Sequence, residues 1–321
     1  MVRWIIVLLL ILLSGHSAKA QEKYPSKPVT IIVAYAPGGS ADLMARAIGK
    51  ALERKSGQPF VVQNRAGAGG AIGSQVAAIA PPDGYTLLVG SVELAIVPTV
   101  DEVFGRKPNF SRDQFQPIAR LSADPFLVAV NASRPWQTLK ELVDDARANP
   151  NSIIYTSGAL YGATHLPIEM FSRAAKISMR HLPAAGGGPA MVSVLGNHAG
   201  LLAVHPGVVR QHASAGKVRL LANFGGERSK VFPEVPTFKE LGYGVENLIW
   251  FGLFAQANVP APIVTALRKI TAEAVKDSEF VQVLERTGTT VAYQDKDEFR
   301  KFWEKDSSDV IDTVRAVGKI Q

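Results

Sequence analysis

Apolar strands and amphipathic helices alternate along the first ninety residues of the chain. Residues 29–35 read VTIIVAY, apolar and β-branched on both faces, which is typical of a strand buried inside a parallel sheet. The next segment carries apolar residues at helical spacing, and Gly57 marks the predicted end of that helix. A helix at 71–80 lies between strands predicted at 59–63 and 86–90. This order predicts an α/β fold with mostly parallel sheets flanked by helices.

The same alternation continues through the rest of the chain. Thr138 and Glu141 form a capping box that opens a predicted helix, and strands are predicted at 153–157 and 218–224. A further amphipathic helix is predicted at 260–276. A chain of 321 residues is long enough for two domains of roughly 100 to 200 residues each. We therefore expect two α/β domains.

Two apolar stretches set the expected division between these domains. Residues 125–130 and 249–255 are predicted to be hinge strands that cross from one domain to the other. The first domain is then expected to comprise residues 21–124 and 256–321, and the second domain residues 125–255. A ligand cleft is expected between the two domains.

Residues 1–20 predict an export signal. Arg3 precedes an unbroken apolar run at 5–13, and Ala18-Lys19-Ala20 offers small residues for cleavage near Ala20. The run is far shorter than the ~20 residues that a membrane-spanning helix needs, so the mature protein is expected in the periplasm and not in a membrane. The chain has no cysteine, which excludes disulfides and a cysteine-linked lipid anchor. Its net charge of +7 is scattered along the sequence, so nucleic acid binding is not indicated.

Two glycines lie between the first predicted strand and the helix that is predicted to follow it. Pro37-Gly38-Gly39-Ser40 lies at the carboxyl end of that strand, where α/β sheets bind their ligands. A helix that starts there offers unpaired main-chain N–H groups and the positive end of its dipole to an anion, and glycine lets the ligand approach closely. All four are therefore candidate ligand-binding residues, and Asp42 is expected to point away from the cleft. A tight turn without a ligand is the alternative.

Two similar loops occur in the second half of the chain. Residues 157–165 follow a predicted strand and precede a helix, and residues 186–189 precede another helix, with Pro189 suited to its first turn. Three glycine-marked helix starts, one in the first domain and two in the second, predict a carboxylate site in one cleft. The candidate ligand-binding residues in these two loops are Ser157, Gly158, Thr164, His165, Gly186 and Gly187.

Other chemistries receive weaker support from the sequence. Ile72 stands where a dinucleotide fingerprint would need its third glycine, so no nucleotide cofactor is predicted. Three histidines recur at a spacing of seven, but Pro206-Gly207 interrupts any helix that would align them, so no metal site is predicted. Ser157 and His165 could form a nucleophile and base, but no third member is evident. No catalytic residue is therefore assigned.

A series of ordered motifs runs through most of the mature chain. The motifs are YPSKP at 24–28, APGG at 36–39, NRAGAGG at 64–70, PDGYTLL at 82–88, THL at 164–166, PEVPT at 233–237 and WFGLFA at 250–255. Together they resemble the Bug family, the extracytoplasmic substrate-binding proteins of tripartite tricarboxylate transporters.

The resemblance implies a type II periplasmic-binding-protein fold, in which two α/β domains close over a ligand that is typically a carboxylate. It implies that ligand contacts come from the loop at 37–40 and from the loop at 157–165. It also implies that the loop after the strand at 86–90 borders the pocket, which adds Ser91 and Glu93 to the candidate ligand-binding residues. Glu93 would either contact an amino or hydroxyl group of the ligand or face solvent.

Two places depart from the pattern of the family. Ala184-Ala185 stands where relatives usually carry a tyrosine and a polar or lysine residue, and Gly200 stands where they usually carry an acidic residue. Either the pocket is larger and admits a bulkier or more apolar acid, or these positions lie behind its wall.

The sequence therefore predicts a monomeric periplasmic receptor that binds a small organic carboxylate and delivers it to the membrane subunits of a tripartite transporter. It predicts no enzyme activity, no cofactor and no metal. Two alternatives stay open at this point. One is a secreted hydrolase that uses Ser157 and His165, and the other is a receptor that presents its ligand to a membrane kinase.

Overall fold

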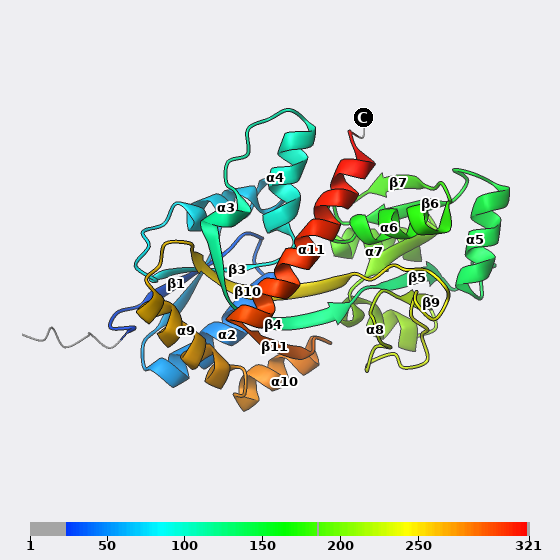
Figure 1. Ribbon diagram of the computed structural model, residues 1–321. Coiled ribbons are helices and arrows are strands. Elements are labelled where there is room, and N and C mark those ends of the chain that lie inside the picture. Colours follow the sequence, from blue (N-terminus) through cyan, green and yellow to red (C-terminus); the bar gives the residue numbers. More distant parts are fainter. Residues whose placement is uncertain (1–23, 185, 320–321) are drawn as a thin grey trace, which may run out of the picture.

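The computed structural model describes residues 24–184 and 186–319 and contains two β-sheets, each covered by helices on both faces (Figure 1). We call the six-stranded sheet with its helices the first lobe and the five-stranded sheet with its helices the second lobe. The predicted α/β architecture is confirmed. The predicted export signal at 1–20 lies outside the described residues. Within the described ranges, every helix is too short or too polar to span a bilayer.

The first lobe contains its strands in the order β11-β4-β10-β3-β1-β2. Helices α2, α9 and α10 bury apolar side chains against one face of this sheet, and α3, α4 and α11 do so against the other. The strands are β1 (Val29–Val33), β2 (Phe60–Asn64), β3 (Thr86–Gly90), β4 (Phe115–Pro125), β10 (Leu248–Gln256) and β11 (Val291–Asp295). The helices are α2 (Ser40–Ser56), α3 (Ala71–Ala78), α4 (Glu93–Val103), α9 (Ala261–Ala274), α10 (Ser278–Arg286) and α11 (Lys296–Val317).

The second lobe contains its strands in the order β7-β6-β8-β5-β9. Helices α5 and α6 cover one face of this sheet, and α7 and α8 cover the other. The strands are β5 (Leu127–Asn131), β6 (Ile154–Ser157), β7 (Arg180–Pro183), β8 (Leu201–Val204) and β9 (Val218–Asn223). The helices are α5 (Leu139–Ala148), α6 (Leu166–Ala175), α7 (Gly187–Leu195) and α8 (Pro206–Ser214).

Both sheets are mixed, whereas the sequence predicted mostly parallel ones. In the first lobe β1 runs parallel to β2 and β3, but β10 runs antiparallel to β3 and β4. In the second lobe β6 runs parallel to β7 and β8, but β5 runs antiparallel to β8 and β9. Parallel neighbours need a crossover within one sheet, but β5 and β10 each follow a strand of the other sheet, so neither is reached through such a crossover.

The chain passes between the lobes along two neighbouring strands. β4 ends at Pro125, which lies opposite Leu248 at the start of β10, and β5 follows after a single residue. On the second-lobe side, Phe224 N donates to Phe126 O at 2.9 Å. Residues 249–255, expected as a hinge strand that ends the second domain, form most of β10 in the first-lobe sheet. The C-terminal helix α11, red in Figure 1, contacts α4 and β4 and reaches α6 of the second lobe.

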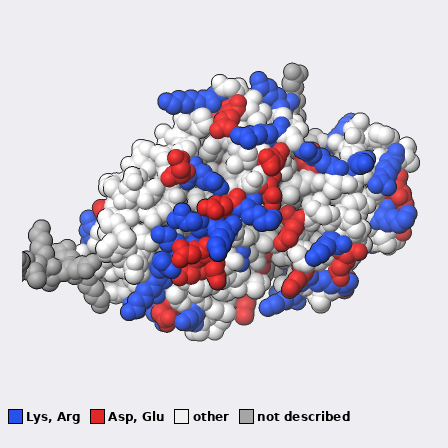
Figure 2. All heavy atoms as spheres, viewed as in Figure 1, with Lys and Arg blue, Asp and Glu red and all other residues white. Residues whose placement is uncertain are grey.

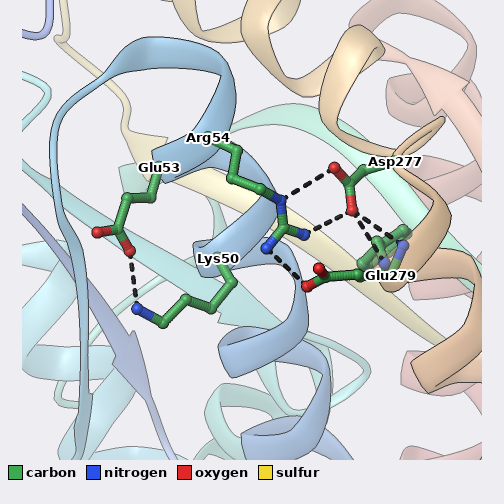
Figure 3. A network of polar contacts seen from close by, with 6 residues as sticks. Lys50, Glu53, Arg54, Asp277 and Glu279 are labelled. Carbon is green, nitrogen blue, oxygen red and sulfur yellow. Dashed lines mark hydrogen bonds and ion pairs between the residues drawn. The ribbon is translucent and has the colours of Figure 1, made fainter.

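Arg54 on α2 forms ion pairs with residues at the start of α10. Positive and negative side chains are intermingled on the face shown in Figure 2, and Figure 3 shows the contacts of Arg54 in close-up. The Arg54 guanidinium contacts both carboxylate oxygens of Asp277, at 3.0 and 2.5 Å, and an oxygen of Glu279 at 2.9 Å. Asp277 also caps α10 by accepting from the main-chain N–H groups of Glu279 and Phe280. Hydrogen bonds from Arg54 hold the pKa of Asp277 below its usual value.

We expect Asp277→Ala to lower the free energy of unfolding by about 1–2 kcal/mol, because it removes a helix cap and an ion pair. Asp277→Asn keeps the capping oxygen and should lose less. Since the pKa of Asp277 is lowered on folding, the ion pair stabilises the protein above the usual aspartate pKa of 3.8, and the effect fades as the pH falls below it. Urea unfolding on either side of that pH measures both effects, with Lys50→Ala as an exposed control. Equal stability of Asp277→Ala and the parent would contradict the assignment.

Candidate functional site

A cavity of about 1220 Å³ lies between the two lobes. The first lobe contributes the loop before α2, the turn before α3 and one face of α4. The second lobe contributes the loop after β6 and the start of α7. Ten of the twelve predicted site residues line this cavity: Pro37, Gly38, Gly39, Ser40, Ser91, Glu93, Gly158, Thr164, Gly186 and Gly187.

The start of α2 forms part of the first-lobe wall. Gly39 is its N-cap residue in an extended conformation, and among the described residues no side chain caps this end. The first turn therefore leaves main-chain N–H groups without intrahelical partners. Gly38 adopts a φ of +84°, which glycine tolerates and other residues rarely adopt. The wall here consists largely of main chain, as the glycine pattern predicts.

Asp42 does not line the cavity, which agrees with the expectation that it points away from the cleft, and its carboxylate binds the loop before α2 instead. Its Oδ2 accepts a hydrogen bond from Gly38 N at 2.9 Å, and its Oδ1 accepts one from Asn64 Nδ2 at 2.9 Å. Arg46 contacts the same carboxylate at 2.9 Å. Burial raises the pKa of Asp42, but these hydrogen bonds outweigh burial and keep the pKa below its usual value. Asp42 therefore stays ionised and fixes the loop by binding the amide of Gly38.

Glu93 borders the cavity although only 2% of it is exposed, so it does not face solvent. Its Oε1 accepts from Ser91 N at 2.9 Å and its Oε2 from Tyr35 OH at 3.1 Å. Burial raises the pKa of Glu93 more than these hydrogen bonds lower it. Gly70 makes room for this side chain, because a Cβ there would lie 3.1 Å from Glu93 Cγ. The Ser91 hydroxyl donates to Trp250 O, so it is already engaged within the protein.

The second lobe completes the wall with two loops that are tied together. Gly158 N donates to Thr164 Oγ1 at 2.9 Å, and Gly186 N donates to Gly158 O at 2.8 Å. A Cβ at position 158 would lie 3.0 Å from the main chain of Gly186. Gly186 is the N-cap residue of α7, and this end likewise has no side-chain cap within the described part of the chain. A second uncapped helix start thus borders the cavity that α2 borders from the first lobe.

Ser157 and His165 are fully buried and lie behind this wall. Ser157 Oγ donates to Ala159 O at 2.8 Å and lies 2.8 Å from His181 Nε2. His165 Nε2 lies 2.9 Å from Tyr155 OH, and its ring centroid lies 4.3 Å from that of His181. Sequence reasoning missed His181, which the β6–β7 register places opposite Tyr155. Among the described residues, no group of three or more histidine or acidic side chains is placed to hold a metal ion.

Apolar side chains form much of the remaining wall, and the sequence did not identify them as site residues. On α4 they resemble a core-facing stripe, because a helix face that meets a cavity has the same spacing as one that meets the core. The charged lining residues Asp101 and Arg106 pair with each other at 2.8 Å. The apolar lining residues include Ile96, Val97, Val100, Leu160, Ile249 and Phe251.

Gly200, one of the departures from the Bug pattern, does not line this cavity. A Cβ there would lie 3.0 Å from the Trp136 ring, beside a separate cavity of about 360 Å³ in the second lobe. Ala184 is not among the lining residues either, and Ala185 lies outside the described residues. Gly200 therefore fits the alternative in which the changed position lies behind the wall.

Comparisons with known proteins agree on one family. The family described as "Tripartite tricarboxylate transporter family receptor" matches residues 44–318. Protein BugT of Bordetella pertussis is 32% identical over 288 residues, which cover 88% of this chain and 86% of BugT. A TctC solute binding protein from Polaromonas, solved with no ligand, is 30% identical with a TM-score of 0.79, over 91% of this chain and 99% of that chain. MatC from Rhodopseudomonas palustris, solved with bound malate, is 26% identical with a TM-score of 0.77, over 91% and 100% of the two chains.

The family match covers most of both lobes and begins at residue 44, after the loop at 37–40. The predicted resemblance to the Bug family and the predicted two-domain binding-protein fold are confirmed. The chain belongs to the tripartite tricarboxylate transporter family of receptors.

Proposed function

We propose that this protein is a periplasmic receptor that captures a small organic carboxylate between its lobes and delivers it to the membrane subunits of a tripartite transporter. One observation carries the proposal: the uncapped starts of α2 and α7 border one cavity from opposite lobes. Helix starts of this kind favour anions. The malate bound by MatC supports an anionic ligand. We further propose that the protein acts as a monomer after removal of residues 1–20.

Ligand capture in this proposal works by closure of two domains. We propose residues 21–124 with 256–321 as the first domain and 125–255 as the second, with β10 completing the first-lobe sheet. A ligand that contacts both domains gains its full binding free energy only in the closed state, so it shifts the population toward that state. Each charge-assisted hydrogen bond contributes about 1.5–3 kcal/mol. Several such bonds suffice for micromolar affinity, at about −8 kcal/mol.

No catalytic step is part of this proposal. The Ser157 hydroxyl is buried and donates to a main-chain oxygen, so a substrate in the cavity does not reach it. Its histidine neighbour is His181, not His165. Burial lowers the pKa of His181 to about 4, and burial together with the nearby His181 lowers the pKa of His165 to about 3. The alternative of a receptor for a membrane kinase shares this binding site and differs only in its partner.

Gly39→Val tests the main-chain site at the start of α2. A Cβ at this position meets only Ala36 O, at 3.7 Å, so the variant should fold. The branched side chain would hold a carboxylate away from the helix amides, and we expect affinity to fall at least about tenfold, the loss of one charge-assisted hydrogen bond. A thermal-shift panel of mono-, di- and tricarboxylic acids identifies a ligand, and titration calorimetry compares the variants. Gly244→Val, in open space outside the cavity, is the matched control. Unchanged affinity in Gly39→Val would place the ligand elsewhere.

His181→Phe tests the histidine pair formed by buried His165 and partly buried His181. Both histidines stay neutral in the folded state well below their usual pKa of 6.5, so the unfolded chain takes up protons first as the pH falls. The parent should therefore lose more stability than His181→Phe between about pH 7 and pH 4.5, by on the order of 1–3 kcal/mol. Urea unfolding across this range measures the difference. His198→Phe, at an exposed position, is the control substitution. Identical pH dependence of the parent and His181→Phe would refute the prediction.

A further inference from the structure

We propose that the cavity selects a monocarboxylic acid with an apolar body, an aromatic or aliphatic acid, and discriminates against dicarboxylates. This inference rests on the proposed function and names the ligand chemistry of the same site. It sets this chain apart from MatC, whose bound malate carries two carboxylates. Three features of the cavity support it: the charges on its wall, the number of free helix starts, and the apolar surface between the lobes.

The charged side chains of the wall offer no free cation to a second carboxylate. Among the described lining residues, the charged ones are Glu93, Asp101 and Arg106. Arg106 donates from Nε to Asp101 Oδ1 at 2.8 Å, and its guanidinium lies 5.0 Å from the Phe104 ring centroid. Asp101 therefore already offsets the charge of Arg106, which weakens the attraction of Arg106 for a second carboxylate. Next to Glu93, a second carboxylate of the ligand would meet another carboxyl group, which offers it no positive charge.

The helix starts supply positive charge for one carboxylate. Each helix start carries about half a unit of positive charge, so those of α2 and α7 together match a single negative charge. The start of α4 is already occupied by Glu93, which accepts a main-chain hydrogen bond there at 2.9 Å. The amides of Gly38 and Gly158 are engaged as well, each by a side chain of its own lobe. The start of α3 also lacks a side-chain cap and borders the cavity, but Gly70 N and Ala71 N donate to Gly67 O and Ala68 O. The main-chain donors at the starts of α2 and α7 suit one charged group.

Much of the rest of the wall is apolar and comes from both lobes. Helix α4 presents Ile96, Val97 and Val100, β10 presents Ile249 and Phe251, and the second lobe adds Leu160. A ring or an alkyl chain placed here would release water from these side chains, which favours binding. A second carboxylate placed here would lose its hydration without gaining a hydrogen-bond partner. The same surface therefore favours an apolar ligand body and disfavours a second charge.

Matched pairs of acids test this selectivity. Hexanoate and adipate share a six-carbon chain and differ in one carboxylate, and benzoate and terephthalate differ in the same way on one ring. In titration calorimetry with the mature protein, we expect each monocarboxylate to bind at least about tenfold more tightly than its dicarboxylate partner. Hexanamide and benzamide, which lack the charge, should bind at least about tenfold more weakly than the matching acids.

The outcomes separate this inference from the proposed function. Dicarboxylates that bind as tightly as their monocarboxylate partners, or more tightly, overturn the inference and leave a carboxylate receptor intact. If none of these acids binds, and malate and citrate fail as well, both proposals are wrong. Amides that bind as tightly as the acids would also overturn both, because the charge would then play no part.

A lysine on the apolar wall should shift the preference toward dicarboxylates. Val97→Lys adds an ammonium group to the wall, and we expect the affinity for adipate relative to hexanoate to rise at least about tenfold. Val100→Lys provides a second variant, and melting curves establish that each is folded. Val76→Lys on α3 is the control, since Val76 is 36% exposed and lies outside the cavity. Folded Val97→Lys and Val100→Lys proteins that keep the parent's ratio would overturn the inference.

Discussion

The proposed anion site depends on the starts of α2 and α7, which have no side-chain caps and border the cavity. Helices α5, α10 and α11 begin with Thr138, Asp277 and Asp295, and each of these side chains accepts a main-chain hydrogen bond at its own helix start. Helices α2 and α7 begin with Gly39 and Gly186 instead, and both starts lie at the cavity. Because glycine has no side chain that could accept a hydrogen bond, the amides of these first turns stay available to a ligand.

Leaving helix amides free creates a second requirement, since an uncapped loop must still be held in place. Each lobe meets it by binding the amide of a nearby glycine with a side chain from the same lobe. Asp42 accepts from Gly38 N and Thr164 accepts from Gly158 N, both at 2.9 Å. Arg46 balances the negative charge of Asp42. The loops are therefore fixed without a side chain covering the helix starts themselves.

The sequence revealed the part of the site that depends on local backbone chemistry. Glycine loops between strands and helices are recognisable because turns and helix starts restrict residue choice locally, and the loops singled out in this way line the cavity. The apolar wall was not recognisable, because Val97 and Val100 follow the spacing of a core-facing stripe. Nor could sequence spacing show that the ring of His165 turns inward onto His181, because that contact depends on how β6 and β7 pair. Residues 249–255 are apolar on both faces, a pattern shared by a hinge strand and by β10 between β4 and β3.

The second-lobe part of the site is also attached to the first lobe, which limits how the cavity can close. Tyr161 OH donates to Gly318 O at 2.5 Å, just beyond α11, and the Tyr161 ring meets Phe104 edge-on at 6.1 Å. Tyr161 and Leu166 are buried in the apolar cluster that α3, α4 and α11 form. In the proposed closure, a movement that keeps these contacts leaves this end of the loop in place. This attachment and the proposed anion site therefore share the loop at 157–165.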